Sequence, residues 1–480
     1  MFFRGIQAVG LLVLCAIFLL PCHAAERPNF VVLLADDLGY GDLGVYGNTL
    51  IKTPHLDRMA AEGVRLTEFY TPAPSCSPAR ISLLTGRYPR RSGLVRVLIP
   101  LEKWGIPASE LTLAEVLGAQ GYRSAMIGKW HLGSRRPYRP LKHGFDEFYG
   151  VLYSNDMAKI PVFKYPPFKL FDGEKPVESP AVRKNLTRNY TERAREFIRA
   201  NRDQPFFLYL AYTMPHRPPS PSDEFRGRSA HGLYGDTVEE IDWSVGEILA
   251  EIRDLGIDQE TFVIFTSDNG PWVRGAYMKK IKGGSTGGLR GGKGTTWEGG
   301  MRVPMIARWP GRIPAGEVRG GIASLLDIFP TLTLLSGARL PDDRVIDGRD
   351  ILPFLAGEAP SPHRDFFYYF RTHLFAIRSG QWKLHLYRRD PEGKQQQLKK
   401  PERCDPPLLY NLVNDPAESA DVAAEHPEVV VRLTKLGAEF DGAIEPVMSL
   451  PPPSKSLRQG LTTGAPKDPN KVPHAKQKKK

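Results

Sequence analysis

The sequence predicts an α/β fold built on a mostly parallel β-sheet. Short apolar runs rich in β-branched and aromatic residues, bounded by polar turns, are typical of strands buried on both faces, as in parallel sheets. Four such runs occur at residues 29–35, 124–128, 205–212 and 261–267. Helical patterns at residues 112–120 and 236–255 lie between them. This alternation of strands and helices predicts an α/β sandwich.

Two of the predicted strands end in pairs of polar residues. Asp36-Asp37 follows the run at residues 29–35, and Asp268-Asn269 follows the run at residues 261–267. The carboxyl ends of parallel strands meet at one edge of a sheet, where α/β folds bind ligands. Each pair alone is consistent with a cap or a solvated turn. Together they predict a site for a hard cation, Ca²⁺ or Mg²⁺, because such ions prefer oxygen donors.

The composition changes near residues 360–363, and aromatic-rich runs with turn signals follow. Strands are expected at residues 366–370, 374–378, 381–387 and 408–412, and a helix at about residues 427–440. These elements predict a small C-terminal α+β domain with an antiparallel sheet. We therefore expect a large first domain at residues 26–360, this second domain at residues 361–450, and a disordered basic tail at residues 451–480.

The N-terminus has the features of a secretory signal peptide, which we place at residues 1–25. Arg4 precedes an apolar stretch at residues 9–20, and Cys22-His23-Ala24-Ala25 offers a small-residue cleavage site. The alternative is a membrane anchor, but a span needs about 20 apolar residues. We expect a secreted or periplasmic protein without a membrane anchor, or a lysosomal one if the source is eukaryotic.

Charge and cysteine content narrow the function classes. The formal charge is +12 and the pI is near 9.4, which favours acidic partners or substrates. Much of the excess lies in the lysine-rich tail, and a nucleic-acid partner is not expected for an exported protein. Removal of the signal peptide leaves only Cys76 and Cys404, so no disulfide network is expected. A Cys76–Cys404 bridge is the alternative to two free thiols.

A short motif around Cys76 carries the strongest functional signal. Cys76-Ser77-Pro78-Ala79-Arg80 is followed after four residues by Thr85-Gly86. A buried free cysteine in an ordinary turn is the alternative interpretation. The motif resembles the type I sulfatase signature C-x-P-[SA]-R-x4-T-G. That resemblance implies oxidation of Cys76 to formylglycine (3-oxoalanine) by a formylglycine-generating enzyme, and a nucleophilic hydrate of the aldehyde.

Further blocks resemble sulfatases in the family's order, from about residue 27 to residue 420. They stand at residues 29–43, 128–133, 215–216, 267–270, 291–300 and 409–418. The block at residues 291–300 is most similar to the arylsulfatase A-like branch. The resemblance implies an alkaline-phosphatase-like sandwich and hydrolysis of a sulfate monoester, in an aryl sulfate or a sulfated carbohydrate, to an alcohol and inorganic sulfate.

The resemblance also implies a metal site. Ca²⁺ is expected, with Mg²⁺ as the alternative, and its ligands would be Asp36, Asp37, Asp268, Asn269 and the formylglycine made from Cys76. The metal would orient the sulfate and balance its charge.

Roles for the other side chains follow from the same resemblance. Arg80 would hold the formylglycine hydrate, since a fixed guanidinium suits that task. Lys129, His216 and Lys293 would surround the sulfate oxygens and stabilise negative charge in the transition state. Either His216 or Lys293 would protonate the leaving alcohol oxygen.

Two more residues complete the expected site. His131 would act as the base on the second hydroxyl of the hydrate, which expels sulfate and restores the aldehyde. Ser154 matches a sulfate-contacting serine of the arylsulfatase A branch, although its flanking residues differ. Substrate selectivity is expected from loops at residues 160–180 and 217–233 and from the C-terminal domain.

Two other functions compete with this hypothesis. The chain could be a phosphomonoester or phosphodiester hydrolase of the related alkaline-phosphatase-like superfamily, which mostly uses Thr or Ser with zinc and histidine ligands. The intact Cys76 motif and the Asp and Asn ligands argue against it. The chain could also be an inactive relative that only binds sulfated glycans, but every motif residue is present.

Overall fold

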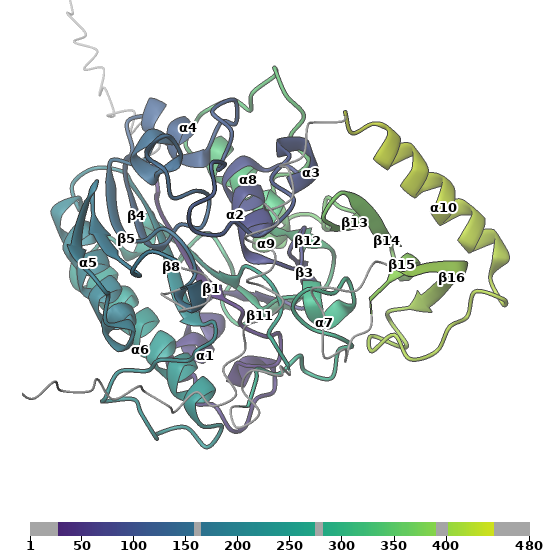
Figure 1. Ribbon diagram of the computed structural model, residues 1–480, viewed down its shortest axis with the longest axis horizontal. Coiled ribbons are helices and arrows are strands. Elements are labelled where there is room, and N and C mark those ends of the chain that lie inside the picture. Colours follow the sequence, from purple (N-terminus) through teal and green to yellow (C-terminus); the bar gives the residue numbers. More distant parts are fainter. Residues whose placement is uncertain (1–26, 158–164, 274–281, 390–401, 446–480) are drawn as a thin grey trace, which may run out of the picture.

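The computed structural model describes residues 27–157, 165–273, 282–389 and 402–445. The predicted signal peptide at residues 1–25 and the predicted tail at residues 451–480 lie outside these ranges. Within them, ten strands form one large sheet in the order β11-β2-β10-β9-β1-β8-β4-β5-β6-β7 (Figure 1). None of the helices in this part of the chain is long and apolar enough to cross a membrane.

Five parallel strands form the centre of the large sheet, and the sequence predicts all of them except the strand at residues 147–151. In sheet order they are β9 (Thr261–Ser267), β1 (Asn29–Asp36), β8 (Phe206–Pro215), β4 (Arg123–Lys129) and β5 (Glu147–Val151). All four neighbouring pairs are parallel. Every residue of β1, β8 and β9 is buried, which accounts for the continuous apolar runs in the sequence.

Short strands extend the sheet on both sides. They are β10 (Met305–Arg308), β2 (Val64–Leu66) and β11 (Glu317–Arg319) on the β9 side, and β6 (Leu170–Asp172) and β7 (Lys175–Glu178) on the β5 side. β10 runs antiparallel to β9 and β2, and β6 runs antiparallel to β5 and β7. The sheet is therefore parallel at its centre and mixed at its edges. A separate two-stranded sheet pairs β3 (Phe69–Tyr70) with β12 (Ala323–Ser324).

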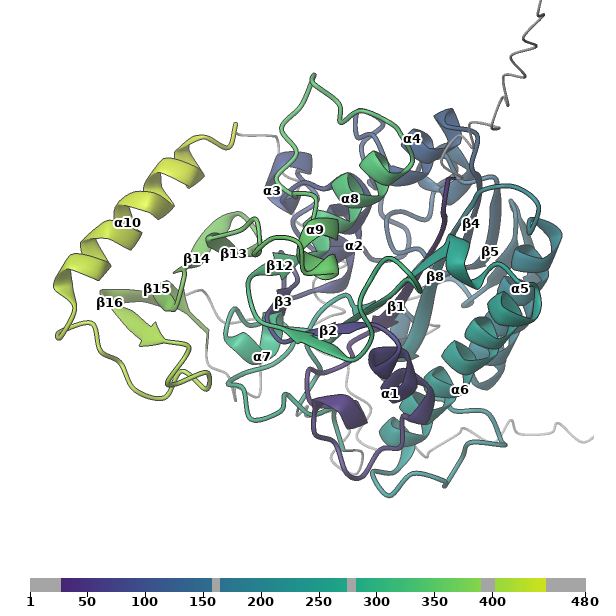
Figure 2. The same ribbon diagram turned by 180° about the vertical axis from the view of Figure 1, so that it is seen from behind.

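Helices cover both faces of the large sheet (Figures 1 and 2). One face carries α1 (Pro54–Ala61), α5 (Leu186–Ala200) and α6 (Leu233–Asp254), and the other carries α2 (Cys76–Thr85), α4 (Leu113–Ala119) and α8 (Ile328–Leu335). Three short helices, α3 (Pro89–Ser92), α7 (Glu298–Met301) and α9 (Leu352–Ala356), lie in the connections. α6 begins three residues before the predicted start, where Gly232, with φ of 77°, turns the chain into the helix.

The C-terminal region folds as the predicted antiparallel sheet. Its strands are β13 (Asp365–Phe370), β14 (His373–Ser379), β15 (Trp382–Arg388) and β16 (Glu402–Asn411). The helix α10 (Pro427–Gly442) packs against β14 and β15. In both views this sheet and α10 stand at one end of the molecule, beyond α7 and β3. The Phe367 and Phe440 rings stack with centroids 3.6 Å apart and join the helix to the sheet.

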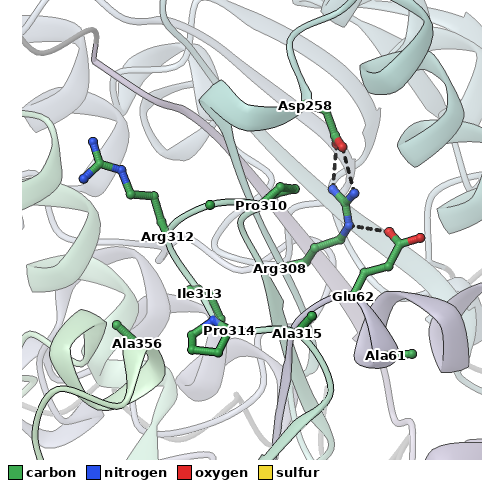
Figure 3. Close-up of a pocket in the computed structure, with 11 residues that line it drawn as sticks. Ala61, Glu62, Asp258, Arg308, Pro310, Arg312, Ile313, Pro314, Ala315 and Ala356 are labelled. Atoms are coloured by element: carbon green, nitrogen blue, oxygen red, sulfur yellow. Dashed lines mark hydrogen bonds and ion pairs between the residues drawn. The ribbon is translucent and has the colours of Figure 1, made fainter.

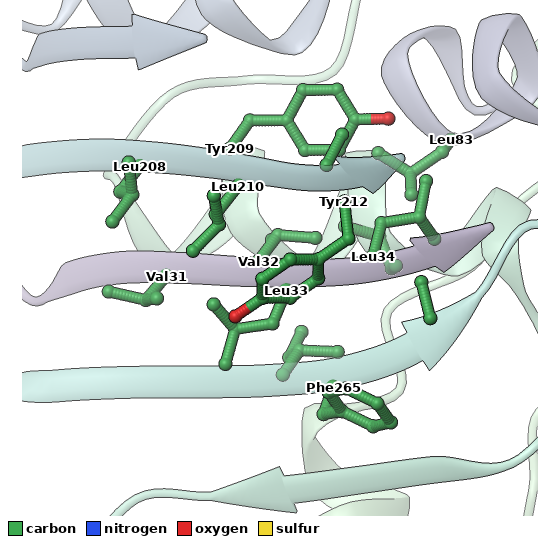
Figure 4. Packing of buried hydrophobic residues seen from close by; sticks show 14 of the residues in the cluster. Val31, Val32, Leu33, Leu34, Leu83, Leu208, Tyr209, Leu210, Tyr212 and Phe265 are labelled. Carbon is green, nitrogen blue, oxygen red and sulfur yellow. The ribbon is translucent and has the colours of Figure 1, made fainter. Parts of the chain in front are cut away.

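The hydrophobic core around the large sheet is centred on β1. Val31 to Leu34 are completely buried between the side chains of β8 and β9, among them Leu210 and Phe265 (Figure 4). Leu83 of α2 packs over the carboxyl end of β1. Close packing of this kind fixes the strand ends, and with them the polar residues that follow.

We predict that Leu33→Ala lowers the free energy of unfolding by about 2–5 kcal/mol, because it leaves a cavity beneath the sheet. Val431→Ala on α10 is the matched control, since Val431 is 69% exposed. Denaturant unfolding followed by tryptophan fluorescence measures both. Equal transition midpoints for the two variants would contradict this picture of the core.

Candidate active site

The polar residues predicted from the sequence meet at the carboxyl edge of the large sheet. Asp36 is the last residue of β1, Lys129 is the last residue of β4, and Asp268 directly follows β9. Cys76 is the first residue of α2. All four are at most 1% exposed, so their charges and hydrogen bonds are set by one another rather than by bulk water.

Backbone turns bring the two polar pairs into contact. Asp37 has φ of 68°, a left-handed conformation that aspartate tolerates better than most residues. Its N–H donates to Asp268 Oδ1 at 3.2 Å, and the Asn269 amide donates to Asp37 Oδ1 at 2.7 Å. The Leu38 N–H donates to Ser267 Oγ at 3.0 Å. The ends of β1 and β9 are therefore locked together, with three carboxylates and an amide side by side.

The Cys76 sulfur lies against these carboxylates. Its Sγ is 3.4 Å from Asp36 Oδ1 and 4.0 Å from Asp37 Oδ1, and Lys293 Nζ lies 3.3 Å away on another side. Burial raises the pKa of the Cys76 thiol well above its usual range, against the opposing effect of Lys129 and Lys293. Cys76 and Cys404 are both free, so the bridge considered as an alternative does not form.

Arg80 reaches the site because it lies one helical turn after Cys76 on α2. Its Nε and Nη2 lie 2.9 and 2.8 Å from Asp268 Oδ2, and its Nη1 donates to the carbonyl oxygen of Lys129 at 2.5 Å. Nη2 is also 3.8 Å from Asp36 Oδ1. Arg80 thus joins α2 to the ends of β9, β4 and β1. Burial and the neighbouring Asp36 carboxylate raise the pKa of Asp268.

Two lysines face the carboxylates from other parts of the chain. Lys129 Nζ donates to Asp36 Oδ2 and, at 3.3 Å, to Ser154 Oγ. Lys293 Nζ forms an ion pair with Asp37 Oδ1 at 2.5 Å. Ser154 Oγ lies 3.3 Å from both ring nitrogens of His216. The hydroxyl therefore connects Lys129 to His216 across the site.

The orientation of His216 depends on Asn155, a residue that the sequence analysis missed. His216 Nδ1 lies 3.0 Å from Asn155 Oδ1 and 2.7 Å from the carbonyl oxygen of Arg217. Both partners accept hydrogen bonds, so Nδ1 carries the proton and Nε2 faces Asp37 Oδ2 at 3.6 Å. Burial lowers the pKa of His216 well below its usual value, and Lys293 and Lys129 add to the effect. Asn155 directly follows Ser154 in the sequence, and this adjacency is the signal that could have identified it.

His131 lies in the loop after β4 and is linked to α2 through Leu98. Its Nε2 donates to the Leu98 carbonyl oxygen at 2.9 Å, and the Leu98 N–H donates to Ser77 Oγ at 3.1 Å. His131 Nδ1 is buried without a hydrogen-bond partner among the described residues. Burial lowers the pKa of this histidine well below its usual value, with Lys129 and Arg80 adding to the effect. The ring is therefore uncharged near neutral pH, and its Nδ1 lone pair is not engaged by any described residue.

The donor set fits a hard divalent cation. Asp37 Oδ2 and Asn269 Oδ1 are buried oxygens without a hydrogen-bond donor among the described residues. Ligand atoms of Asp36, Asp37, Cys76 and His216 all lie within 4.8 Å of one another. Oxygen atoms from carboxylates and an amide are the ligands that Ca²⁺ and Mg²⁺ prefer. The arrangement can hold such an ion while Lys129, Lys293 and His216 face an anion.

A separate surface hollow of about 650 Å³ lies beside Arg308 of β10 (Figure 3). Arg308 crosses it and pairs with Glu62 at 2.7 Å and with Asp258 at 2.6 Å. Its basic side chain is thus already neutralised by two carboxylates. None of the residues predicted for the active site lines this hollow.

Two sequence-family models match the chain. The sulfatase model matches residues 28–338, and the model for the C-terminal region of aryl-sulfatase matches residues 361–458.

Characterised relatives are similar along most of their length. N-acetylgalactosamine-6-sulfatase of Mus musculus is 41% identical over 475 residues, which cover 91% of this chain and 90% of the relative. Arylsulfatase A of Homo sapiens is 40% identical over 461 residues, which cover 88% and 89%. Steryl-sulfatase of Mus musculus is 38% identical over 512 residues, which cover 85% and 81%.

A solved structure agrees with these relatives. The PsFucS1 sulfatase from Pseudoalteromonas sp. superposes with a TM-score of 0.80 at 30% identity, covering 87% of this chain and 90% of its own. The predicted alkaline-phosphatase-like α/β sandwich with an antiparallel C-terminal sheet is confirmed. The chain therefore belongs to the sulfatase family and is a sulfuric ester hydrolase related to arylsulfatase A.

Proposed function

We propose that this sulfatase hydrolyses a sulfate monoester through a formylglycine hydrate made from Cys76, with the help of a bound Ca²⁺. The observation that carries the proposal is the position of Cys76 Sγ, 3.4 Å from the Asp36 carboxylate and 3.3 Å from the Lys293 ammonium group. A nucleophile at this point would have a metal site on one side and a cation for the sulfate on the other.

Formylglycine would give the site what a cysteine thiol lacks. The aldehyde hydrate would supply one hydroxyl for attack on sulfur and a second hydroxyl for release of sulfate without hydrolysis at sulfur. Arg80, fixed by Asp268 and one helical turn from residue 76, is suited to hold the hydrate. Since Cys76 is 1% exposed, the formylglycine-generating enzyme would act before the site closes.

Ca²⁺, or Mg²⁺ in its place, would be held by Asp36, Asp37, Asp268, Asn269 and residue 76. The partnerless oxygens Asp37 Oδ2 and Asn269 Oδ1 support this assignment. The ion would supply Lewis-acid stabilisation and balance the charge of the sulfate.

The cations and polar groups opposite the carboxylates would bind the sulfate oxygens. Lys129, Ser154 and His216 form a chain of contacts at 3.3 Å. Lys293 lies beside residue 76 and belongs to a glycine-rich loop at residues 283–297. Hydrogen-bond donors that are already in position stabilise an anionic group more strongly in a buried site than in water, because they need no reorganisation during the reaction.

Proton transfers fall to three residues. Lys293 carries protons and lies beside residue 76, so it can protonate the leaving alcohol oxygen. His216 is the alternative acid, but it would first have to take up a proton at Nε2, which faces the same space. His131 would take the proton from the second hydroxyl of the hydrate, because its Nδ1 is the nitrogen left unpaired by the contact with Leu98.

The substrate class we propose is an aryl sulfate or a sulfated carbohydrate, since the relatives include an arylsulfatase and an N-acetylgalactosamine-6-sulfatase. The loop at residues 217–233 and the C-terminal region would select the group that carries the sulfate, together with residues 165–180. Residues 160–164 of the first predicted loop lie outside the described residues.

The location and domain organisation we propose rest on the sequence. A signal peptide at residues 1–25 would direct the chain to the periplasm or the exterior, or to a lysosome in a eukaryote, without a membrane anchor or a nucleic-acid partner. The catalytic domain would span residues 26–360, followed by the C-terminal domain at residues 361–450.

The first test compares two substrates that differ only in the transferred group. We expect the matured enzyme to cleave 4-nitrophenyl sulfate with a higher kcat/KM than 4-nitrophenyl phosphate, measured by release of 4-nitrophenol. Faster cleavage of the phosphate would contradict the proposal. Cys76→Ala should abolish turnover of both, because it removes the precursor of the nucleophile.

The second test concerns the metal. Asp268→Asn should lose bound Ca²⁺ and sulfatase activity together, because it removes a charged ligand and the partner of Arg80. Asp258→Asn is the matched control, since that carboxylate pairs with Arg308 outside the site. Elemental analysis of the purified proteins and initial rates measure the outcome. Full turnover by Asp268→Asn, or by the enzyme in excess chelator, would exclude the metal from the mechanism.

The third test removes the proposed base. His131→Ala should lower kcat about 10²–10⁴-fold, the usual contribution of a general acid or base, while the conversion of Cys76 is unchanged. His143→Ala is the control, because His143 is also buried but bonds to the carbonyl of Pro137 away from the site. An equal loss in both variants would mean that His131 serves only the fold.

A further inference from the structure

A buried cluster of charges joins the C-terminal antiparallel sheet to the loop that carries Lys293. Lys383 of β15 is completely buried, and its Nζ lies 2.9 Å from Glu298 Oε1 and 3.0 Å from Glu418 Oε1. The same Nζ donates to the Thr296 carbonyl oxygen at 2.9 Å. The Lys383 ammonium group therefore contacts the backbone of Thr296, three positions after Lys293.

Glu298 and Glu418 hold the rest of this loop. Glu298 accepts from Tyr70 at 2.8 Å, from Tyr368 at 3.0 Å and from Arg302 at 2.7 Å, so β3, β13 and α7 meet at one carboxylate. Against the burial that would raise it, Lys383 and Arg302 hold the pKa of Glu298 well below its usual range.

Glu418 belongs to the segment at residues 409–418, which resembles a sulfatase C-terminal block but has no role in the proposed chemistry. Its Oε2 accepts from the Glu298 N–H at 2.7 Å, and its Oε1 lies 2.7 Å from His385 Nε2. Its carbonyl oxygen accepts from Arg290 at 2.6 Å. Glu418 thus contacts the loop on both sides of Lys293.

A second cation, Arg389, directly follows β15 and also contacts the loop. Arg389 Nη1 donates to the carbonyl oxygen of Gly294, the residue after Lys293, at 2.7 Å. The Trp297 Nε1–H donates to the Arg389 carbonyl oxygen at 3.0 Å. On its other side the loop is bound to the segment just before α2, because the Gly294 N–H donates to the Pro74 carbonyl oxygen at 2.8 Å. The loop is therefore held between the C-terminal sheet and the start of α2.

From these contacts we propose that Lys383 is a positioning residue, which fixes Lys293 beside residue 76 through the Thr296 carbonyl. The C-terminal sheet is then part of the catalytic apparatus, although Lys383 does not touch the reacting atoms. This inference rests on the proposed role of Lys293 at the sulfate. Small displacements of a positioned group lower rates strongly, so the effect of Lys383 is expected in turnover.

The variants must separate positioning from folding. Lys383→Met alone leaves two buried carboxylates short of a partner, which is strongly destabilising. Lys383→Met/Glu418→Gln removes one charge of each sign and keeps the cluster balanced, while still releasing Thr296. Arg389→Met releases Gly294 independently. Lys435→Met on α10 is the matched control, since Lys435 is exposed and pairs only one turn away, with Glu439.

The experiment is a double-mutant cycle on the full-length matured enzyme. Rates with 4-nitrophenyl sulfate are divided by the formylglycine content, measured by mass spectrometry. We expect Lys383→Met/Glu418→Gln and Arg389→Met each to lower kcat/KM at least ~10-fold in the wild-type background, but less than ~2-fold when Lys293 is already alanine. Lys435→Met should leave the rate unchanged.

The outcomes are distinguishable. Equal fold losses with and without Lys293, or a full rate in both test variants, would overturn the positioning role while leaving the proposed function intact. A wild-type rate for Lys293→Ala alone would contradict the proposed role of Lys293, and with it this inference.

Discussion

The site depends on one electrostatic constraint, the packing of three carboxylates at the ends of β1 and β9. Asp36, Asp37 and Asp268 are fully buried, and carboxylates in such a place repel one another unless cations face them. Arg80, Lys129 and Lys293 supply those cations from three other parts of the chain. Removing one partner of a buried pair costs about 3–5 kcal/mol, so α2, β4 and the glycine-rich loop are bound to this edge of the sheet. The same charges equip the site for a divalent cation beside an anionic ester.

The second level of organisation is the way in which the chain delivers these groups. The strand ends are rigid because β1 and its neighbours are packed on both faces, and Cys76 is fixed as the first residue of a buried helix. Lys293 is different, since it lies in a loop rather than in a strand or helix. Its position relies on contacts from Pro74 on one side and from Lys383 and Arg389 on the other. The C-terminal sheet thereby supports the side of the site that carries Lys293, in the same way as the large sheet supports the other side.

Much of this could be predicted from the sequence. The buried strands at residues 29–35 and 261–267 were visible as continuous apolar runs, and their polar ends had to meet at one edge of a parallel sheet. The edge strands could not be predicted, because three residues such as those of β2 carry no period and pair only in the tertiary context. α5 was missed although Leu186, Tyr190, Ala194 and Phe197 have helical spacing, because charged residues fill the positions between them.

The motifs also gave the reactive side chains, but not Asn155 or Lys383. Those two act through contacts between segments 61 and 87 positions apart.

The central claim is that residue 76 works as a formylglycine. The most direct test is the mass of the tryptic peptide covering residues 66–80, from protein purified from its native source. We expect a peptide in which an aldehyde or its hydrate replaces the thiol of Cys76, in an amount that follows the specific activity with 4-nitrophenyl sulfate. An unmodified thiol in fully active protein would exclude formylglycine as the nucleophile.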